Sequence, residues 1–229
     1  MTEPIKEFSF KTVENFDEHI DLSIPNYSFL ANQCKQYSDY FIREHTNVVD
    51  LGCSSGKFLN SLKTVQNTNY TGYDVADNLF QTPNTNVQLL KKDLIELSDS
   101  TLCRSPHDEC FPQDISFAIS LFTLQFLPPI KRQEVIRAVG EHMVKGGAFI
   151  SCEKIYSTDA KLQDITNSIY YEFKNNSFTG DQILSKERDL RKIMTPQSLT
   201  DSMKQLECIG KPNIFFMSYN FVGIIVIKD

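Results

Sequence analysis

The chain has 229 residues, of which 41% are hydrophobic and 23% are charged, as in ordinary globular proteins and unlike disordered or collagen-like chains. Its formal net charge of −6 at pH 7 argues against a protein that holds nucleic acid through its own positive field. The first twenty residues carry acidic side chains and no apolar stretch, so they predict neither a signal peptide nor a membrane anchor. We therefore expect a cytoplasmic protein that binds neither nucleic acid nor a membrane directly.

The six cysteines are scattered singly, without a C-x-x-C motif, which predicts reduced thiols. Cys103, His107 and Cys110 could in principle share a metal ion, but no second ligand pair lies near them in the sequence. The polar stretch around them is more typical of an irregular surface loop. We expect no metal site.

Helical and strand-like patterns alternate along the first two thirds of the chain. Apolar and aromatic residues recur at helical spacing from Tyr27 to Phe41, and a short apolar strand over 47–51 is followed by glycines and a helix over 57–63. An amphipathic helix follows Pro129, with Met143 on its apolar face. Further short β-rich runs predict strands over 70–74, 87–90, 115–122 and 148–153. Strands separated by helices are typical of a parallel sheet.

The last third begins with helices. The apolar stripe Leu162, Ile165, Ile169 and Phe173 predicts one helix, and a second, charged helix follows over 181–194. A third helix is expected to start at Thr195 and Pro196. Two β-rich runs, about 213–218 and 221–227, predict an antiparallel hairpin.

These elements predict a single α/β domain over 1–229. It should contain a seven-stranded, mostly parallel sheet with the C-terminal hairpin at its edge. We expect an N-terminal helical extension, 1–43, and a helical insert, 158–194, to cover the ligand pocket.

Glycines and acidic residues follow three of the predicted strands, where open parallel sheets bind ligands. Gly52 and Gly56 allow a tight turn after the first strand, although many such corners use glycine only for packing. Asp74 lies 18 residues after Gly56, close to the spacing at which an acidic side chain meets the ribose hydroxyls in nucleoside-binding folds. Asp93 ends the third strand, where methyltransferase-like folds contact adenine. Without a G-x-G-x-x-G or Walker lysine, this pattern favours S-adenosylmethionine over nicotinamide cofactors and ATP.

The segment from Val48 to Gly56, VVDLGCSSG, resembles motif I of the class I S-adenosylmethionine-dependent methyltransferase fold, a Rossmann-like fold, with Ser54 in place of the usual middle glycine. More of the chain resembles the carboxy-S-adenosylmethionine synthase family, and the run FTLQFL over 122–127 is the most specific part. The other matching segments are 16–20, 24–28, 52–54, 153–154, 172–174, 185–188 and 219–221.

The resemblance implies a homodimer that converts S-adenosylmethionine and prephenate to carboxy-S-adenosylmethionine and phenylpyruvate, for modification of the wobble uridine of tRNA. The resemblance would make Arg188 and Tyr27 catalytic. For Arg188 the chemistry fits, because a guanidinium can pair with the planar carboxylate of the product. The implied ligand contacts are Tyr27, Gly52, Cys53, Ser54, Asp74, Val75, Asp93, Leu94, Leu121 and Arg188. At two of these positions, Val75 and Leu121, the family has asparagine.

Two other functions remain open on the sequence. One is a methyltransferase that acts on a small molecule or RNA, which needs few recognisable residues. The other is a catalytically silent nucleotide-binding module, which Val75 and Leu121 would favour. Arg188 also lies in a mixed charge run that is typical of a solvated helix face, and Tyr27 could serve core packing.

Overall fold

The computed structural model describes residues 16–99 and 110–229. Their strands form one sheet in the order β3-β2-β1-β4-β5-β8-β7, with the two-residue β6 paired beside β5. The strands are β1 (Asn47–Leu51), β2 (Asn69–Asp74), β3 (Val87–Lys91), β4 (Ile115–Leu121), β5 (Met143–Tyr156), β6 (Gln197–Ser198), β7 (Pro212–Ser218) and β8 (Phe221–Ile227). Strands β1 to β5 are parallel, and β8 is antiparallel to both β5 and β7. The predicted α/β class and C-terminal hairpin are confirmed, and β6 is the one addition to the seven expected strands.

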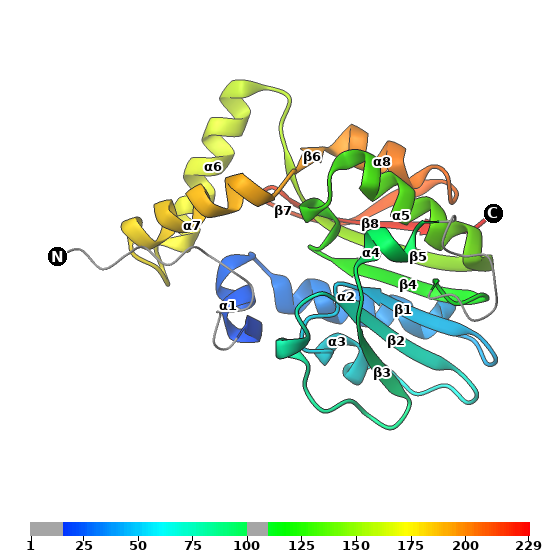
Figure 1. The fold of residues 1–229 in the computed structure, drawn as a ribbon. Helices are drawn as coiled ribbons and strands as arrows, with labels where there is room; N and C mark the ends of the chain where they lie inside the picture. The colour runs from blue at the N-terminus through cyan, green and yellow to red at the C-terminus, as the bar shows by residue number, and fades with distance from the viewer. Residues whose placement is uncertain (1–15, 100–109) are drawn as a thin grey trace.

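Helices cover both faces of the sheet (Figure 1). They are α1 (Phe16–Ser23), α2 (Tyr27–Phe41), α3 (Lys57–Ser61), α4 (Leu94–Leu97), α5 (Pro129–His142), α6 (Ala160–Lys174), α7 (Gly180–Ile193) and α8 (Leu199–Leu206), with short 3-10 helices η2 (Asp77–Leu79) and η3 (Leu124–Phe126). Val139 of α5 and Leu206 of α8 belong to the core of one face, and Leu30 of α2 and Leu59 of α3 to the core of the other. The sheet is thus buried on both sides, as parallel sheets require.

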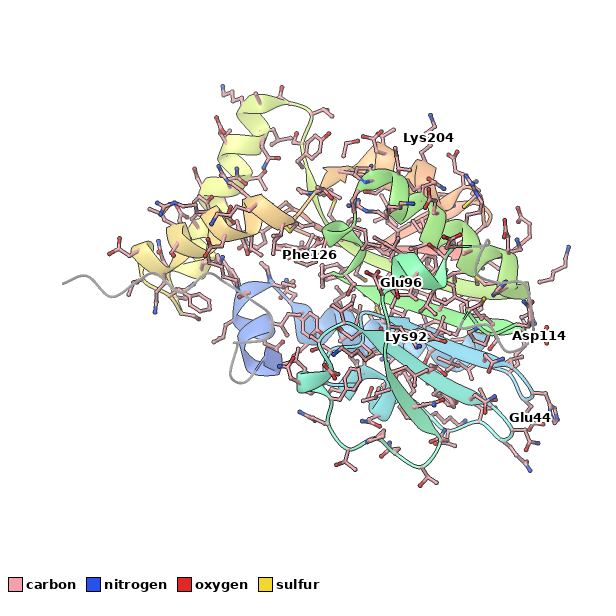
Figure 2. The ribbon with its side chains drawn as sticks, viewed as in Figure 1. Glu44, Lys92, Glu96, Asp114, Phe126 and Lys204 are labelled. Atoms are coloured by element: carbon pink, nitrogen blue, oxygen red, sulfur yellow. The ribbon has the colours of Figure 1, made fainter. Side chains whose placement is uncertain are left out.

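Helices α6 and α7 extend beyond one end of the sheet (Figure 1). Figure 2 shows which end this is: Glu44 and Asp114, which precede β1 and β4, lie at the opposite end from these helices. Lys92 and Phe126, which follow β3 and β4, lie nearer to them. The two helices therefore stand on the side where the parallel strands end, which is where ligands bind in this architecture.

Two predicted helix ends are wrong. Helix α8 begins at Leu199 and not near Pro196, because Gln197 and Ser198 pair with the end of β5, and Ser198 Oγ then accepts a capping hydrogen bond from Asp201 N at 3.1 Å. Met143 lies in β5 and not in the preceding helix, because it pairs with Ile115 of β4. In both places strand pairing overrides the local helical pattern.

Helix α6 is present where it was predicted, but three of the four residues of its apolar stripe do not face the core, and only Phe173 packs against it. Leu162, Ile165 and Ile169 are 54%, 46% and 46% exposed. The buried side chains of this helix are those of Tyr170 and Lys174. The fold therefore buries a lysine and an aromatic ring at the cavity side and leaves aliphatic side chains on the surface.

Cys34, Cys53, Cys152 and Cys208 are free thiols, as predicted. Cys110 is disulfide-bonded, so the expectation of reduced thiols is wrong at that position. Cys103 and His107, the other members of the weighed metal trio, lie outside the described residues. Within 16–99 and 110–229 no group of metal-ligating side chains gathers, and no helix there is long and apolar enough to cross a membrane.

Candidate functional site

A cavity of about 550 Å³ lies at the carboxyl ends of the parallel strands. Its wall includes nine of the ten predicted contact residues: Tyr27, Gly52, Cys53, Ser54, Asp74, Val75, Asp93, Leu94 and Leu121. Arg188 is the exception, because it is exposed on α7 and does not line this cavity within its own chain. Residues of α1, α2, α6 and α7 complete the wall.

The turn after β1 depends on left-handed backbone conformations. Gly52 has a φ of +83°, and a Cβ built on it would lie 2.0 Å from Thr123 Oγ1, so a larger residue does not fit there. Ser54 stands where the motif usually has glycine, and it still adopts a φ of 48°. Its backbone N–H donates to Asp74 Oδ2 at 2.9 Å, which holds the serine in this unfavourable conformation. The replacement of glycine by serine therefore leaves the turn intact.

Asp74 anchors this turn to the end of β2. Its Oδ2 accepts from Ser54 N, and its Oδ1 accepts from Ala76 N at 2.8 Å. A carboxylate has about four acceptor sites, so both oxygens keep capacity for hydroxyl groups of a ligand. Asp93 likewise has a structural role, because its Oδ1 caps α4 by accepting a hydrogen bond from Ile95 N at 2.8 Å. Both carboxylates are thus held rigidly where the cavity begins.

The cavity wall contains two buried polar atoms that a ligand could satisfy by hydrogen bonding. Asp50 Oδ1 and Ser54 Oγ have no hydrogen-bond partner within the described part of the chain. Burial, and then repulsion by Asp74, raises the pKa of Asp50 to about 8, so its carboxyl is largely protonated at neutral pH and can donate. Buried polar groups are normally satisfied, and the hydroxyls and amino groups of a nucleoside fit this lining. Asp50 was not among the predicted site residues, although an acid inside an otherwise apolar strand was a signal for it.

The FTLQFL run follows β4 and forms part of the cavity wall. The side chain of Gln125 accepts a hydrogen bond from Lys154 N at 2.7 Å, and its backbone carbonyl accepts one from Thr195 N at 2.7 Å. Buried Arg132 donates to Leu124 O at 2.8 Å and to Thr195 O at 2.7 Å. These bonds fasten the end of β4 to β5 and to the segment after α7, which fixes the width of the cavity.

Three lysines that sequence reasoning did not assign to the site also line the cavity. They are Lys154 at the end of β5, Lys174 on α6 and Lys186 on α7. All three lie in segments that resemble the family, but a lysine on an amphipathic helix usually indicates a solvated face. Only the packing of α6 and α7 over the strand ends shows that these side chains face inward.

Glu153, next to this wall, makes stability depend on pH. Burial raises its pKa from 4.5 to about 7, while Arg132 and Ser151 oppose the shift. The folded state thus holds a proton that the unfolded state loses between pH 4.5 and 7, so stability falls as the pH rises through that window. We expect Glu153→Gln to remove about 3 kcal/mol of this fall between pH 5 and pH 8, measured by chemical denaturation. An unchanged difference between the two pH values would show that Glu153 ionises normally.

No family model matches the chain, but comparison with individual known proteins assigns it to a family. The carboxy-S-adenosyl-L-methionine synthase of Staphylococcus epidermidis is 30% identical to it over 96% of this chain and 95% of the relative. The synthase of Methylococcus capsulatus is 26% identical over 93% of this chain and 89% of the relative. The chain belongs to the carboxy-S-adenosyl-L-methionine synthase family.

The solved structures agree with this assignment at the level of the fold. The structure of PigF with SAH superposes with a TM-score of 0.56 at 14% identity, over 89% of this chain and 55% of that one. The CurJ carbon methyltransferase gives a TM-score of 0.56 at 12% identity, over 88% of this chain and 53% of that one. The class I methyltransferase fold is confirmed, and the prediction of S-adenosylmethionine as cofactor or substrate is confirmed at the level of the family.

Proposed function

We propose that this protein transfers a carboxyl group to S-adenosylmethionine, with prephenate as the carboxyl donor, and so forms carboxy-S-adenosylmethionine and phenylpyruvate. The observation that carries the proposal is one continuous cavity, which is lined both by the Asp74 turn and by Lys154, Lys174 and Lys186. A nucleoside and an anionic co-substrate fit such a cavity side by side. We extend the proposal to tRNA: the product would serve modification of the wobble uridine by another enzyme.

The proposed reaction balances without a further reactant. The S-methyl group loses one proton, and its carbon forms a bond to the carbon dioxide that leaves the prephenate ring. Prephenate also loses its ring hydroxyl as hydroxide, which takes up that proton to give water, and the ring becomes aromatic. The residues of this chain would hold the two molecules close together and exclude bulk water, which would otherwise quench the carbon nucleophile.

We propose that 1–229 is one S-adenosylmethionine-binding domain, in which 1–43 and 158–194 act as covers of the cavity. Support comes from Tyr27 of α2 and Tyr170 of α6, which line it together with Phe122 and Phe221. The centroids of the Tyr170 and Phe221 rings are 5.4 Å apart, and those of Phe122 and Phe221 are 5.7 Å apart. These rings supply an apolar wall against which water can be excluded.

We also propose a homodimer without intrinsic affinity for tRNA. The exposed aliphatic side chains of α6, Leu162, Ile165 and Ile169, are a surface that a second copy would cover. In such a dimer, α7 of one copy would bring Arg188 toward the cavity of the other, which would reconcile its catalytic role with its exposed position. The net charge of −6 supports the absence of tRNA binding.

The experiment that tests the function is mass spectrometry of the nucleoside fraction after the enzyme has been incubated with S-adenosylmethionine and prephenate. We expect a nucleoside heavier by one carboxyl group, and label from ¹³C in the ring carboxyl of prephenate should appear in it. Omission of prephenate is the control. A product without the label, or S-adenosylhomocysteine together with a methylated acceptor, would instead support the methyltransferase. Bound S-adenosylmethionine without any turnover would support the silent module.

A further inference from the structure

The carboxyl group of Asp50 lies at the boundary between the apolar core and the cavity. Strand β1 runs through the middle of the sheet (Figure 1), and Asp50 pairs there with Gly72 of β2 and Ile119 of β4. The residue is 2% exposed, yet it belongs to the cavity lining. Val48, two positions earlier and therefore on the same side of the strand, is part of the core beneath α2 and α3. The acid is thus withdrawn from bulk water and adjoins the space that a ligand occupies.

This carboxyl group has no cationic partner in the described part of the chain. Its Oδ1 accepts no hydrogen bond there, and burial followed by repulsion from Asp74 raises its pKa to about 8. Burial and then Asp50 raise the pKa of the neighbouring Cys53 thiol, so this thiol stays neutral as well. Several lysines line the same cavity, but none of them lowers the pKa of Asp50: Lys35, Lys57, Lys92, Lys154, Lys174 and Lys186.

The ligands of an S-adenosylmethionine-dependent enzyme differ in net charge. At neutral pH S-adenosylmethionine carries a sulfonium, an ammonium and a carboxylate group, which leaves one positive charge in excess. S-adenosylhomocysteine lacks the sulfonium and is neutral overall. A product whose S-methyl group has gained a carboxylate is neutral overall as well. The substrate therefore differs from either product by one positive charge, whether the protein transfers a carboxyl group or a methyl group.

A positive charge in the cavity favours the ionised form of Asp50. Opposite charges attract strongly in a medium of low dielectric constant, so a nearby cation lowers the pKa of a buried carboxyl group. By linkage, a ligand that lowers this pKa binds the ionised form more tightly, and its binding expels the proton. A neutral ligand has no such effect, so the proton stays on the carboxyl group.

We propose that Asp50 is a specificity-determining residue that responds to the net charge of the ligand. Its carboxyl group releases a proton to the solvent when S-adenosylmethionine binds, and keeps that proton when S-adenosylhomocysteine binds. The step leaves a carboxylate on Asp50 and one proton in the solvent, and it needs no other reactant. The inference requires S-adenosylmethionine as the ligand but not the carboxyl-transfer function proposed above. Its consequence is that the cavity prefers substrate to product, increasingly so as the pH rises towards 8.

The test is calorimetric titration of both ligands into the wild-type protein at pH 5.5 and pH 7.5. We expect the affinity for S-adenosylmethionine to rise about threefold or more between these pH values, because deprotonation of Asp50 costs more at the lower pH. The affinity for S-adenosylhomocysteine should change less than about twofold. Titrations in two buffers of different ionisation enthalpy measure the protons released. S-adenosylmethionine should release about half a proton more than S-adenosylhomocysteine at pH 7.5.

Asp50→Asn is the decisive variant, because asparagine has the shape of the protonated acid and cannot ionise. The variant should fold, since Asp50 is mostly protonated in the free protein at neutral pH. At pH 7.5 it should bind S-adenosylmethionine about threefold or more weakly than the wild-type protein does, without the additional release of protons. Asp39→Asn is the matched control and should behave as wild type, because Asp39 is exposed on α2 and lies outside the cavity lining.

Three outcomes would overturn the inference. The first is equal proton release with both ligands, which would assign the effect to the ammonium group that they share. The second is a wild-type affinity for S-adenosylmethionine that is the same at pH 5.5 and pH 7.5. The third is an Asp50→Asn variant that keeps the pH dependence of the wild-type protein. If this variant fails to fold, the first two outcomes, both measured on the wild-type protein, decide the question.

Discussion

Arg188→Ala should lower the rate at which the carboxylated nucleoside forms by about 30-fold or more, while the affinity for S-adenosylmethionine changes little. A desolvated guanidinium that pairs with the transferred carboxylate is worth about 2–5 kcal/mol, and S-adenosylmethionine lacks that carboxylate. The measurement is the rate of product formation by mass spectrometry, together with calorimetry of S-adenosylmethionine. Arg137→Ala is the matched control, because Arg137 is also an exposed arginine on a helix and does not line the cavity.

The exposed position of Arg188 sharpens this prediction. If it serves the cavity of a second copy, Arg188→Ala and Asp74→Ala chains mixed in equal amounts should recover activity. Half of the dimers are then mixed, and one site of each mixed dimer has both residues, so about a quarter of wild-type activity is expected. Recovery requires a dimer, which sedimentation of the wild-type protein checks directly. Full activity of Arg188→Ala alone would show that Arg188 has no role in the reaction and belongs to a solvated helix face, as its charge run suggests.

Asp74→Ala should weaken S-adenosylmethionine binding by roughly 10- to 100-fold. A charged acceptor that satisfies two hydroxyls in a partly dry cleft contributes about 1.5–3 kcal/mol. Asp77→Ala is the matched control: Asp77 is exposed three positions further on, pairs with Lys91 at 3.2 Å and does not line the cavity. Calorimetry gives both affinities.

Asp74 also accepts hydrogen bonds from Ser54 N and Ala76 N, so its removal could loosen the turn after β1. Thermal unfolding separates the two effects, because a loosened turn lowers the unfolding temperature in the absence of ligand. Unchanged affinity in a folded Asp74→Ala variant would remove Asp74 from the ribose site.

Much of the fold was predictable because its signals are local. Helix α2 follows an apolar period of 3.6 residues, and strands β1 and β4 are short continuous apolar runs. Both signals can be read from neighbouring residues alone. The glycine turn and the place of Asp74 at the end of β2 were predictable for the same reason, since a tight turn requires glycine at Gly52 and an acidic residue that directly follows an apolar strand is visible in the sequence. The family was recognisable because short runs such as FTLQFL keep both their composition and their order.

Only the tertiary structure decided which face of each element looks inward. In α6 the aliphatic residues predict a buried stripe, but contact with the strand ends buries Tyr170 and Lys174 instead. The start of α8 was decided by the pairing of Gln197 and Ser198 with β5, which no local pattern encodes. Lys154, Lys174 and Lys186 reach the cavity from β5, α6 and α7, and the same packing leaves Arg188 outside it. A site of this kind depends on the distances between side chains on separate elements. Those distances are set only when the whole chain has folded, so no local pattern in the sequence shows them.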